Sequence, residues 1–203
     1  MIELSGHTAR VTGSTRGVGR AIAEAFARAG ADLVLHGEVH DADADDAFSA
    51  CQALRATCHL VVADLAKPHS ASVPPLAAEA LTCAPNIDIL VNNAGRFYDV
   101  PFTDMTVDRF ESTFQLNVAA GYFLTQAFAL HWIPRNVSGR VLFTGSINGR
   151  LAEADSTAYD ISKGAVEMMV KTLCVALAPK GIRVNGMAPG LVRTSQTTWI
   201  EDQ

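Results

Sequence analysis

A glycine-rich segment near the start of the chain constrains the fold more than any other feature. The segment, residues 12–19, reads Thr-Gly-Ser-Thr-Arg-Gly-Val-Gly and stands between an apolar run at 8–12 and a helical pattern at 20–29. Glycine at 13, 17 and 19 lets the backbone turn sharply and pack a helix closely against a strand. The free N–H groups and the dipole of that helix attract an anion such as a pyrophosphate. A strand before the segment and a helix after it distinguish a dinucleotide-binding turn from an ordinary glycine-rich loop.

Short apolar runs alternate with helical patterns along the whole chain. The alternation predicts an α/β, doubly wound, three-layer Rossmann fold with a mainly parallel sheet of six strands, in a single domain over residues 1–203. We expect strands at 8–12, 33–36, 60–63, 87–91, 140–144 and 182–185, and helices at 20–29, 106–132 and 156–178. The acidic segment 41–46 lacks the glycine and the terminal glutamate of a calcium loop, so we expect a solvated loop or the start of a helix there.

The composition excludes several functions. The chain has 16 Lys and Arg against 21 Asp and Glu, a net charge of −5, without a basic cluster, which argues against binding to nucleic acid. The sequence contains no apolar run of about 18 residues and begins with no basic and apolar leader, so we expect no membrane span and a cytoplasmic protein. The four cysteines form no CxxC pair, and we therefore predict neither a disulfide nor a metal site.

One charged residue conflicts with the predicted sheet. Arg10 falls in the first expected strand, at the centre of the sheet. An unpaired charge buried there lowers the folding stability by roughly several kcal/mol. We therefore expect Arg10 to extend its charged end to solvent or to find a carboxylate partner.

The end of the second expected strand bears on the choice of cofactor. A carboxylate at this point binds ribose hydroxyls and repels a 2′-phosphate. Gly37 leaves room for a phosphate, and Arg16 in the turn could pair with one. Glu38 follows immediately and could itself take the hydroxyls. The balance slightly favours NADP(H) over NAD(H).

Two residues late in the chain are suited to proton transfer. Tyr159 and Lys163 are four apart on an expected helix, so their side chains lie on one face, a turn from each other. Bringing a phenol of pKa about 10 near 7 takes about 4 kcal/mol, which a nearby ammonium in a low-dielectric cleft can supply. Taken alone, such a pair is usually an amphipathic surface pair, so the interpretation depends on the other motifs.

Several further motifs follow the glycine turn in order. They are Asp64-Leu65 after the third strand, Asn92-Asn93-Ala94-Gly95 after the fourth, Asn117 in the long helix, Ser146 thirteen residues before Tyr159, and Pro189-Gly190-Leu191-Val192-Arg193-Thr194 after the sixth. In order and spacing the set resembles the short-chain dehydrogenase/reductase family, over residues 4 to about 194. Within the family it resembles 3-oxoacyl-carrier-protein reductases and sugar or polyol dehydrogenases alike.

The resemblance implies an oxidoreductase that moves a hydride between NAD(P)(H) and a carbonyl or secondary alcohol. It makes Tyr159 the general acid/base, with Lys163 lowering its pKa and holding the nicotinamide ribose. Ser146 would donate a hydrogen bond to the substrate oxygen, and Asn117 would position a water that relays protons to Lys163. The implied cofactor-binding residues are Gly13, Thr15, Arg16, Gly17, Val18, Gly19, Asp64, Leu65, Asn92, Ala94, Gly95, Tyr159, Lys163, Pro189, Gly190, Val192 and Thr194.

The resemblance also implies features around this core. Family members continue into a helical lid over the substrate and a final strand, and residues 191–203 resemble the start of that lid. They assemble through the long helices after Thr106 and Ser156, so we expect a homo-oligomer, a dimer or a tetramer. An inactive nucleotide-binding regulatory or scaffold protein of the same fold is the alternative; such proteins commonly lose the Tyr or the Lys, and this chain keeps both. The substrate stays open among acyl thioesters, sugars and steroids.

Overall fold

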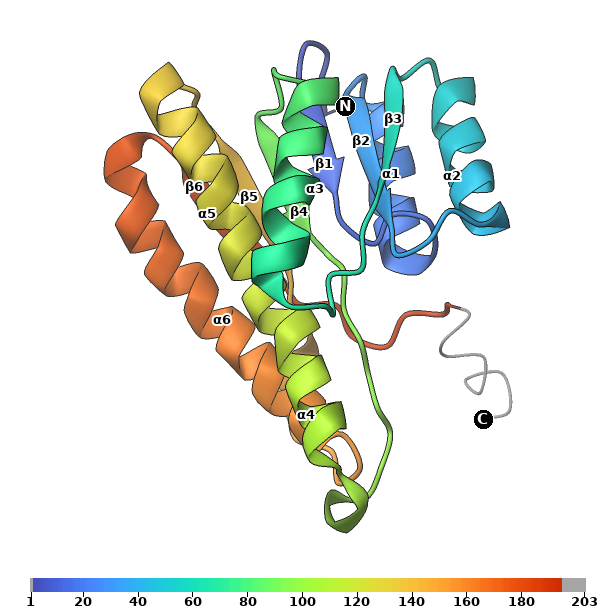
Figure 1. Ribbon diagram of the computed structural model, residues 1–203, viewed down its shortest axis with the longest axis vertical. Coiled ribbons are helices and arrows are strands. Elements are labelled where there is room, and N and C mark those ends of the chain that lie inside the picture. Colours follow the sequence, from blue (N-terminus) through green and yellow to red (C-terminus); the bar gives the residue numbers. More distant parts are fainter. Residues whose placement is uncertain (1, 195–203) are drawn as a thin grey trace.

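A six-stranded parallel sheet forms the centre of the protein in a computed structural model that describes residues 2–194 (Figure 1). The strands are β1 (Thr8–Val11), β2 (Asp32–Gly37), β3 (Cys58–Val62), β4 (Ile89–Asn92), β5 (Arg140–Thr144) and β6 (Arg183–Met187). Their order is β3-β2-β1-β4-β5-β6, every neighbouring pair being parallel. The predicted doubly wound fold is confirmed, and the chain changes direction across the sheet between β1 and β4, where such folds bind ligands.

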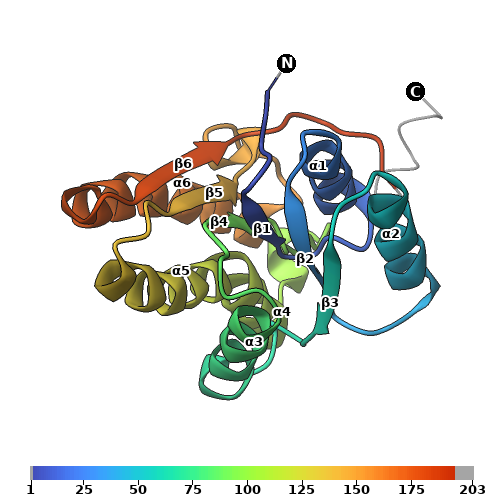
Figure 2. The ribbon, with the colours of Figure 1, turned by 90° about the horizontal axis from the view of Figure 1, so that it is seen from above.

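Helices cover both faces of the sheet (Figure 2). They are α1 (Gly17–Arg28), α2 (Ala42–Ala53), α3 (His69–Cys83), α4 (Val107–Phe114), α5 (Ala120–Trp132) and α6 (Thr157–Leu177). Because strand side chains alternate between faces, Leu33 and Leu35 of β2 pack in the core beneath α1 and α2, whereas Val34 packs in the core beneath α3, α5 and α6. No helix within residues 2–194 is long and apolar enough to cross a bilayer.

The expected helix over 106–132 is interrupted. Thr106 accepts a hydrogen bond from the Arg109 amide at 3.3 Å and caps α4. Residues Gln115–Ala119 then form a π-helical segment before α5 begins. Such segments are frequent at functional sites, and this one carries Asn117.

Two helices lie in segments whose local sequence pattern is weakly helical. The acidic segment 41–46 is the start of α2, since Asp41 accepts a hydrogen bond from the Ala44 amide at 3.0 Å. Helix α3 was not predicted, and it contains Pro74 and Pro75. Proline removes a backbone donor from a helix interior, so the local pattern argued against a helix there.

Arg10 contradicts both expectations stated for it. Its side chain is fully buried, with 0% exposure, so it does not reach solvent. Its three guanidinium nitrogens have no hydrogen-bond partner among residues 2–194. Burial lowers the pKa of Arg10 to about 10, and the charge of Glu79 on α3 only partly opposes this effect. A buried and unpaired guanidinium therefore lies on the α3 side of the sheet.

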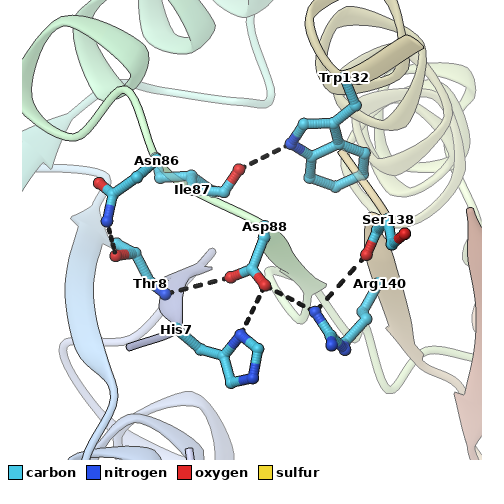
Figure 3. A network of polar contacts seen from close by, with 8 residues as sticks. All are labelled: His7, Thr8, Asn86, Ile87, Asp88, Trp132, Ser138 and Arg140. Atoms are coloured by element: carbon cyan, nitrogen blue, oxygen red, sulfur yellow. Dashed lines mark hydrogen bonds and ion pairs between the residues drawn. The ribbon is translucent and has the colours of Figure 1, made fainter. Parts of the chain in front are cut away.

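A polar network ties three strands together at their amino ends (Figure 3). Asp88 Oδ2 accepts from Arg140 and contacts His7 Nδ1, both at 2.6 Å, and Asp88 Oδ1 accepts from the Thr8 amide at 3.1 Å. Trp132 donates its indole N–H to the carbonyl of Ile87 at 2.7 Å. This network holds β1, β4 and β5 in register, at the end of the sheet opposite the turn after β1.

Candidate active site

The glycine-rich turn joins the carboxyl end of β1 to α1. Gly13 and Gly17 have φ angles of +60° and +56°, a region that favours glycine. A Cβ on Gly19 would lie 2.0 Å from the carbonyl oxygen of Gly13, so only glycine lets the helix approach the turn so closely. Helix α1 begins at Gly17, and its first amides have no intrahelical acceptors. The turn therefore has the shape and the free donors to hold a pyrophosphate.

A buried histidine holds this turn from the side of β2. His36 Nδ1 accepts the N–H of Gly13, and His36 Nε2 donates to the carbonyl of Ala63, both at 3.0 Å. Burial lowers the pKa of His36 to about 3, so the ring is neutral and keeps the lone pair that Gly13 needs. The sequence assigned His36 no role; a lone imidazole at a strand end beside the turn was the only available signal.

Thr12 and Asn93 hold the turn from the side of β4. Thr12 Oγ1 accepts the amides of Asn93 and Ala94, at 2.9 and 3.0 Å. Asn93 Nδ2 donates to the carbonyls of Thr12 and Gly13 at 3.0 and 3.2 Å. Asn92, a predicted cofactor residue, instead has a buried side chain that donates to Thr125 on α5 at 3.0 Å. The contact between the two motifs thus runs through Ala94 and through Asn93, to which the sequence assigned no role.

Of the predicted cofactor-binding residues after β3 and in the turn, some are buried and others are partly exposed. Asp64 accepts a hydrogen bond from the Ala66 amide at 2.9 Å, which shapes the loop after β3, and Leu65 is buried in the core. Thr15 is also buried. Arg16 precedes α1, and its half-exposed side chain extends towards the N-terminus of α2.

The predicted residues after β6 return towards the turn. The carbonyl of Pro189 accepts the amide of Ile147 at 3.0 Å, which joins this segment to the loop after β5. Thr194 lies next to Gly17, because a Cβ built on Gly17 would be 3.7 Å from the Thr194 methyl group. Gly190 and Val192 lie between these two anchors in the chain. Of the segment expected to begin the lid, residues 195–203 lie outside the described residues.

Lys163 is buried beneath the predicted site, with 5% exposure. Its Nζ donates to the carbonyl of Thr144 at 2.8 Å and lies 5.4 Å from the centroid of the Tyr159 ring. Burial lowers the pKa of Lys163 to about 8. The ammonium is therefore close to losing its proton near neutral pH, and it lies beside the phenol as the helical spacing predicts.

Tyr159 has a pKa above its ordinary value in this structure. Burial is the main cause; contact with Ser146 lowers the pKa, whereas the charges of Asp160 and Glu153 raise it. The expectation that Lys163 brings this pKa near 7 is not met, so the phenol is protonated at neutral pH and can act as a proton donor. Phe97 packs edge-on against the Tyr159 ring, with 5.1 Å between the ring centroids.

Asn117 is held between two segments by its own amide group. Its Oδ1 accepts the N–H of Arg96 at 2.7 Å, and its Nδ2 donates to the Arg96 carbonyl at 2.9 Å and to Ser162 Oγ at 3.0 Å. A Cβ on Gly95 would lie 3.3 Å from Asn117 Oδ1 and 3.8 Å from Lys163 Nζ. The loop after β4, the π-helical segment and α6 therefore meet at this point.

A small cavity lies beside these groups. Its volume is about 10 Å³, and its lining includes Thr12, Asn92, Asn117 and Thr144. Asn92 Oδ1 and Thr144 Oγ1 are buried and have no hydrogen-bond partner among residues 2–194. A space of this size with polar groups in its wall matches a single water molecule.

Comparison with known proteins places this arrangement in a family. The family described as short chain dehydrogenase matches residues 7–203. The chain belongs to this family. As a short-chain dehydrogenase it is an NAD(P)-dependent oxidoreductase that acts on CH–OH groups of donors.

Named relatives cover nearly the whole of this dehydrogenase. The L-rhamnose 1-dehydrogenase (NADP(+)) of Thermoplasma acidophilum is 31% identical over 194 residues, which are 96% of this chain and 76% of the relative. The gluconate 5-dehydrogenase of Gluconobacter oxydans is 34% identical over 197 residues, 97% and 75% of the two chains. A solved 3-oxoacyl (acyl-carrier-protein) reductase from Agrobacterium tumefaciens with NADP bound superposes with a TM-score of 0.91 at 31% identity, covering 100% of this chain and 76% of that one.

Proposed function

We propose that this dehydrogenase interconverts a carbonyl and a secondary alcohol, with Tyr159 as the general acid/base. The observation that carries the proposal is the packing of the Tyr159 phenol against the buried Lys163 ammonium, with Ser146 contacting the same phenol. A neutral phenol next to a hydroxyl donor is suited to protonating a carbonyl oxygen. Relatives named for L-rhamnose and gluconate favour a sugar or a sugar acid as the substrate.

Each of the four side chains would have a defined part. In the reductive direction Tyr159 gives its proton to the substrate oxygen, and Ser146 donates a hydrogen bond to the same atom. The positive charge of Lys163 stabilises the phenolate that remains. Asn117 and the cavity beside it would hold a water that returns a proton to Lys163. In the oxidative direction the same groups act in reverse.

The nicotinamide nucleotide supplies or accepts the hydride when bound. The glycine turn would hold its pyrophosphate, because the amides at the start of α1 are free to donate. We infer a slight preference for NADP(H), in which Arg16 would pair with the 2′-phosphate. A relative named for NADP(+) supports this choice, whereas another is named for NAD(P)(+) and does not discriminate between the two nucleotides.

Fluorescence titration with NADH and NADPH, followed by turnover on a panel of sugars, sugar acids and other carbonyl compounds, tests the proposal. We expect micromolar binding of at least one nucleotide and turnover of at least one carbonyl compound. The absence of binding to either nucleotide would refute it. Binding without turnover of any substrate would favour the inactive regulatory protein.

We also propose that the dehydrogenase assembles as a homo-oligomer, a dimer or a tetramer, in the cytoplasm. Helices α4, α5 and α6 expose large apolar side chains, which a second copy could cover. These residues are Phe110, Tyr122, Phe123, Leu130, Ile161, Met168 and Val175. Sedimentation equilibrium should give a mass of two or four chains, and a monomer at micromolar concentration would contradict this proposal.

A further inference from the structure

We propose that Asp41 and Asp43, at the start of α2, weaken the selectivity for NADP(H) by competing with its 2′-phosphate for Arg16. The inference rests on the proposed function, in that the nucleotide lies along the glycine turn. It assigns a role in cofactor choice to two residues of the acidic segment 41–46, for which the sequence indicated no function.

The ion pairs of Arg16 are the first observation. Its NH2 lies 4.0 Å from Asp41 Oδ2, and its NH1 lies 3.7 Å from Asp43 Oδ2. The three side chains are 53%, 37% and 51% exposed, so both pairs are in contact with solvent. Exposed pairs are individually weak and screened by salt. Arg16 is therefore oriented by the two carboxylates, yet a stronger anion can displace them.

The end of β2 has no space for a side chain. Gly37 closes the strand, and a Cβ there would lie 2.8 Å from the Val39 carbonyl oxygen and 2.9 Å from the Thr15 methyl group. The carboxylate that commonly takes the ribose hydroxyls at this position has no room. Discrimination between the two nucleotides thus depends on charged groups nearby, the guanidinium of Arg16 against the carboxylates of Asp41 and Asp43.

The two carboxyl oxygens of Asp41 have separate partners. Oδ1 accepts the Ala44 amide at 3.0 Å and caps α2, while Oδ2 faces Arg16. Asparagine is as good a helix cap as aspartate. Asp41→Asn therefore removes the charge that faces Arg16 and keeps the cap, so the expected effect separates from unfolding of α2.

The double variant Asp41→Asn/Asp43→Asn tests the inference by binding alone. We would measure dissociation constants for NADPH and NADH by fluorescence, and for 2′,5′-ADP and 5′-AMP by calorimetry. NADPH and 2′,5′-ADP should bind the double variant about five- to tenfold more tightly than they bind the unaltered protein. The affinities for NADH and 5′-AMP should differ between the two proteins by less than about twofold. The gain should shrink in 0.5 M KCl, roughly as screening requires.

Asp45→Asn is the matched control. Asp45 is on the same helix, but its carboxylate pairs with His40 at 2.7 Å rather than with Arg16. The ratio of NADPH to NADH affinity should stay within about twofold of the unaltered protein. An equal gain in this control would show a general effect of negative charge and would overturn the inference.

Arg16→Gln completes a double-mutant cycle. Combined with the two aspartate substitutions, it should abolish their gain in NADPH affinity. An equal gain without Arg16, or no gain in the double variant, would overturn the inference while leaving the proposed function intact. If the unaltered protein binds neither nucleotide, the proposed function itself fails, and this inference fails with it.

Discussion

Arg10→Met should stabilise the protein. Burial moves the pKa of Arg10 from 12.5 to about 10, and at about 1.4 kcal/mol per pH unit this corresponds to a penalty of about 3 kcal/mol for the charged side chain. Because the guanidinium is charged in both the folded and unfolded states below pH 10, the whole penalty is present at pH 7. Methionine fills most of the same space, and any void it leaves costs less than about 1 kcal/mol. We expect a net gain of about 2 to 3 kcal/mol.

Urea unfolding followed by circular dichroism measures this gain at pH 7 and a fixed protein concentration, since oligomers gain apparent stability with concentration. Arg183→Met is the matched control, because Arg183 lies exposed on the edge strand β6; its unfolding free energy should change by less than about 0.5 kcal/mol. If Arg10→Met instead loses more than about 1 kcal/mol, the guanidinium has a compensating partner and the reasoning is wrong.

Three further predictions concern the turn and the site. Burial lowers the pKa of His36 to about 3, so the imidazole takes up a proton in the unfolded state before it does in the folded state. The free energy of unfolding should therefore fall below pH 6.5 by up to about 1.4 kcal/mol per pH unit. Urea titrations should show a shallower fall for His36→Asn, and an equally steep fall in that variant would contradict the assignment. The rate of carbonyl reduction should decline above pH about 8 as Lys163 loses its proton. The Lys163→Arg variant should show this decline at a pH higher by more than about one unit, because arginine keeps its proton. A decline at the same pH in the variant would show that Lys163 is not the group that titrates. Gly19→Ala should abolish nucleotide binding and lower the free energy of unfolding by about 1 to 3 kcal/mol. Gly164→Ala should do neither, because the nearest atom to a Cβ at Gly164 lies 3.6 Å away. Normal nucleotide binding by Gly19→Ala would refute the packing argument.

The regular elements were predictable because their signals are local. The strand positions agree with the apolar runs to within about two residues, and Gly30 and Gly181, which follow α1 and the short turn after α6, have positive φ angles as helix ends favour. The π-helical interruption around Asn117 was not predicted, and the Asn117 side chain within it accepts a hydrogen bond from Arg96, 21 residues away. Helix α3 was not predicted because it contains two adjacent prolines, which disfavour a helix. Its packing against the sheet compensates the cost of these prolines.

The proximity of Tyr159 and Lys163 was predictable from the sequence, but the electrostatics of the pair were not. The spacing of Tyr159 and Lys163 placed both side chains together, as the structure bears out. The pKa values depend on burial by segments distant in sequence, and so the raised value at Tyr159 could not be derived from spacing alone. The same holds for His36, whose role depends on Gly13 and Ala63, residues that only the folded sheet brings to either side of its ring.

Turnover by the Tyr159→Phe variant tests whether Tyr159 is the general acid/base. Tyr122→Phe, on the exposed surface of α5, is the control, and the same preparations should be titrated with NADH and NADPH. We predict that Tyr159→Phe binds the nucleotide within about twofold of the unaltered protein and loses about 10²- to 10⁴-fold in kcat, with the control unchanged. A Tyr159→Phe variant that binds nucleotide and retains the kcat of the unaltered protein would contradict the role of Tyr159 as general acid/base.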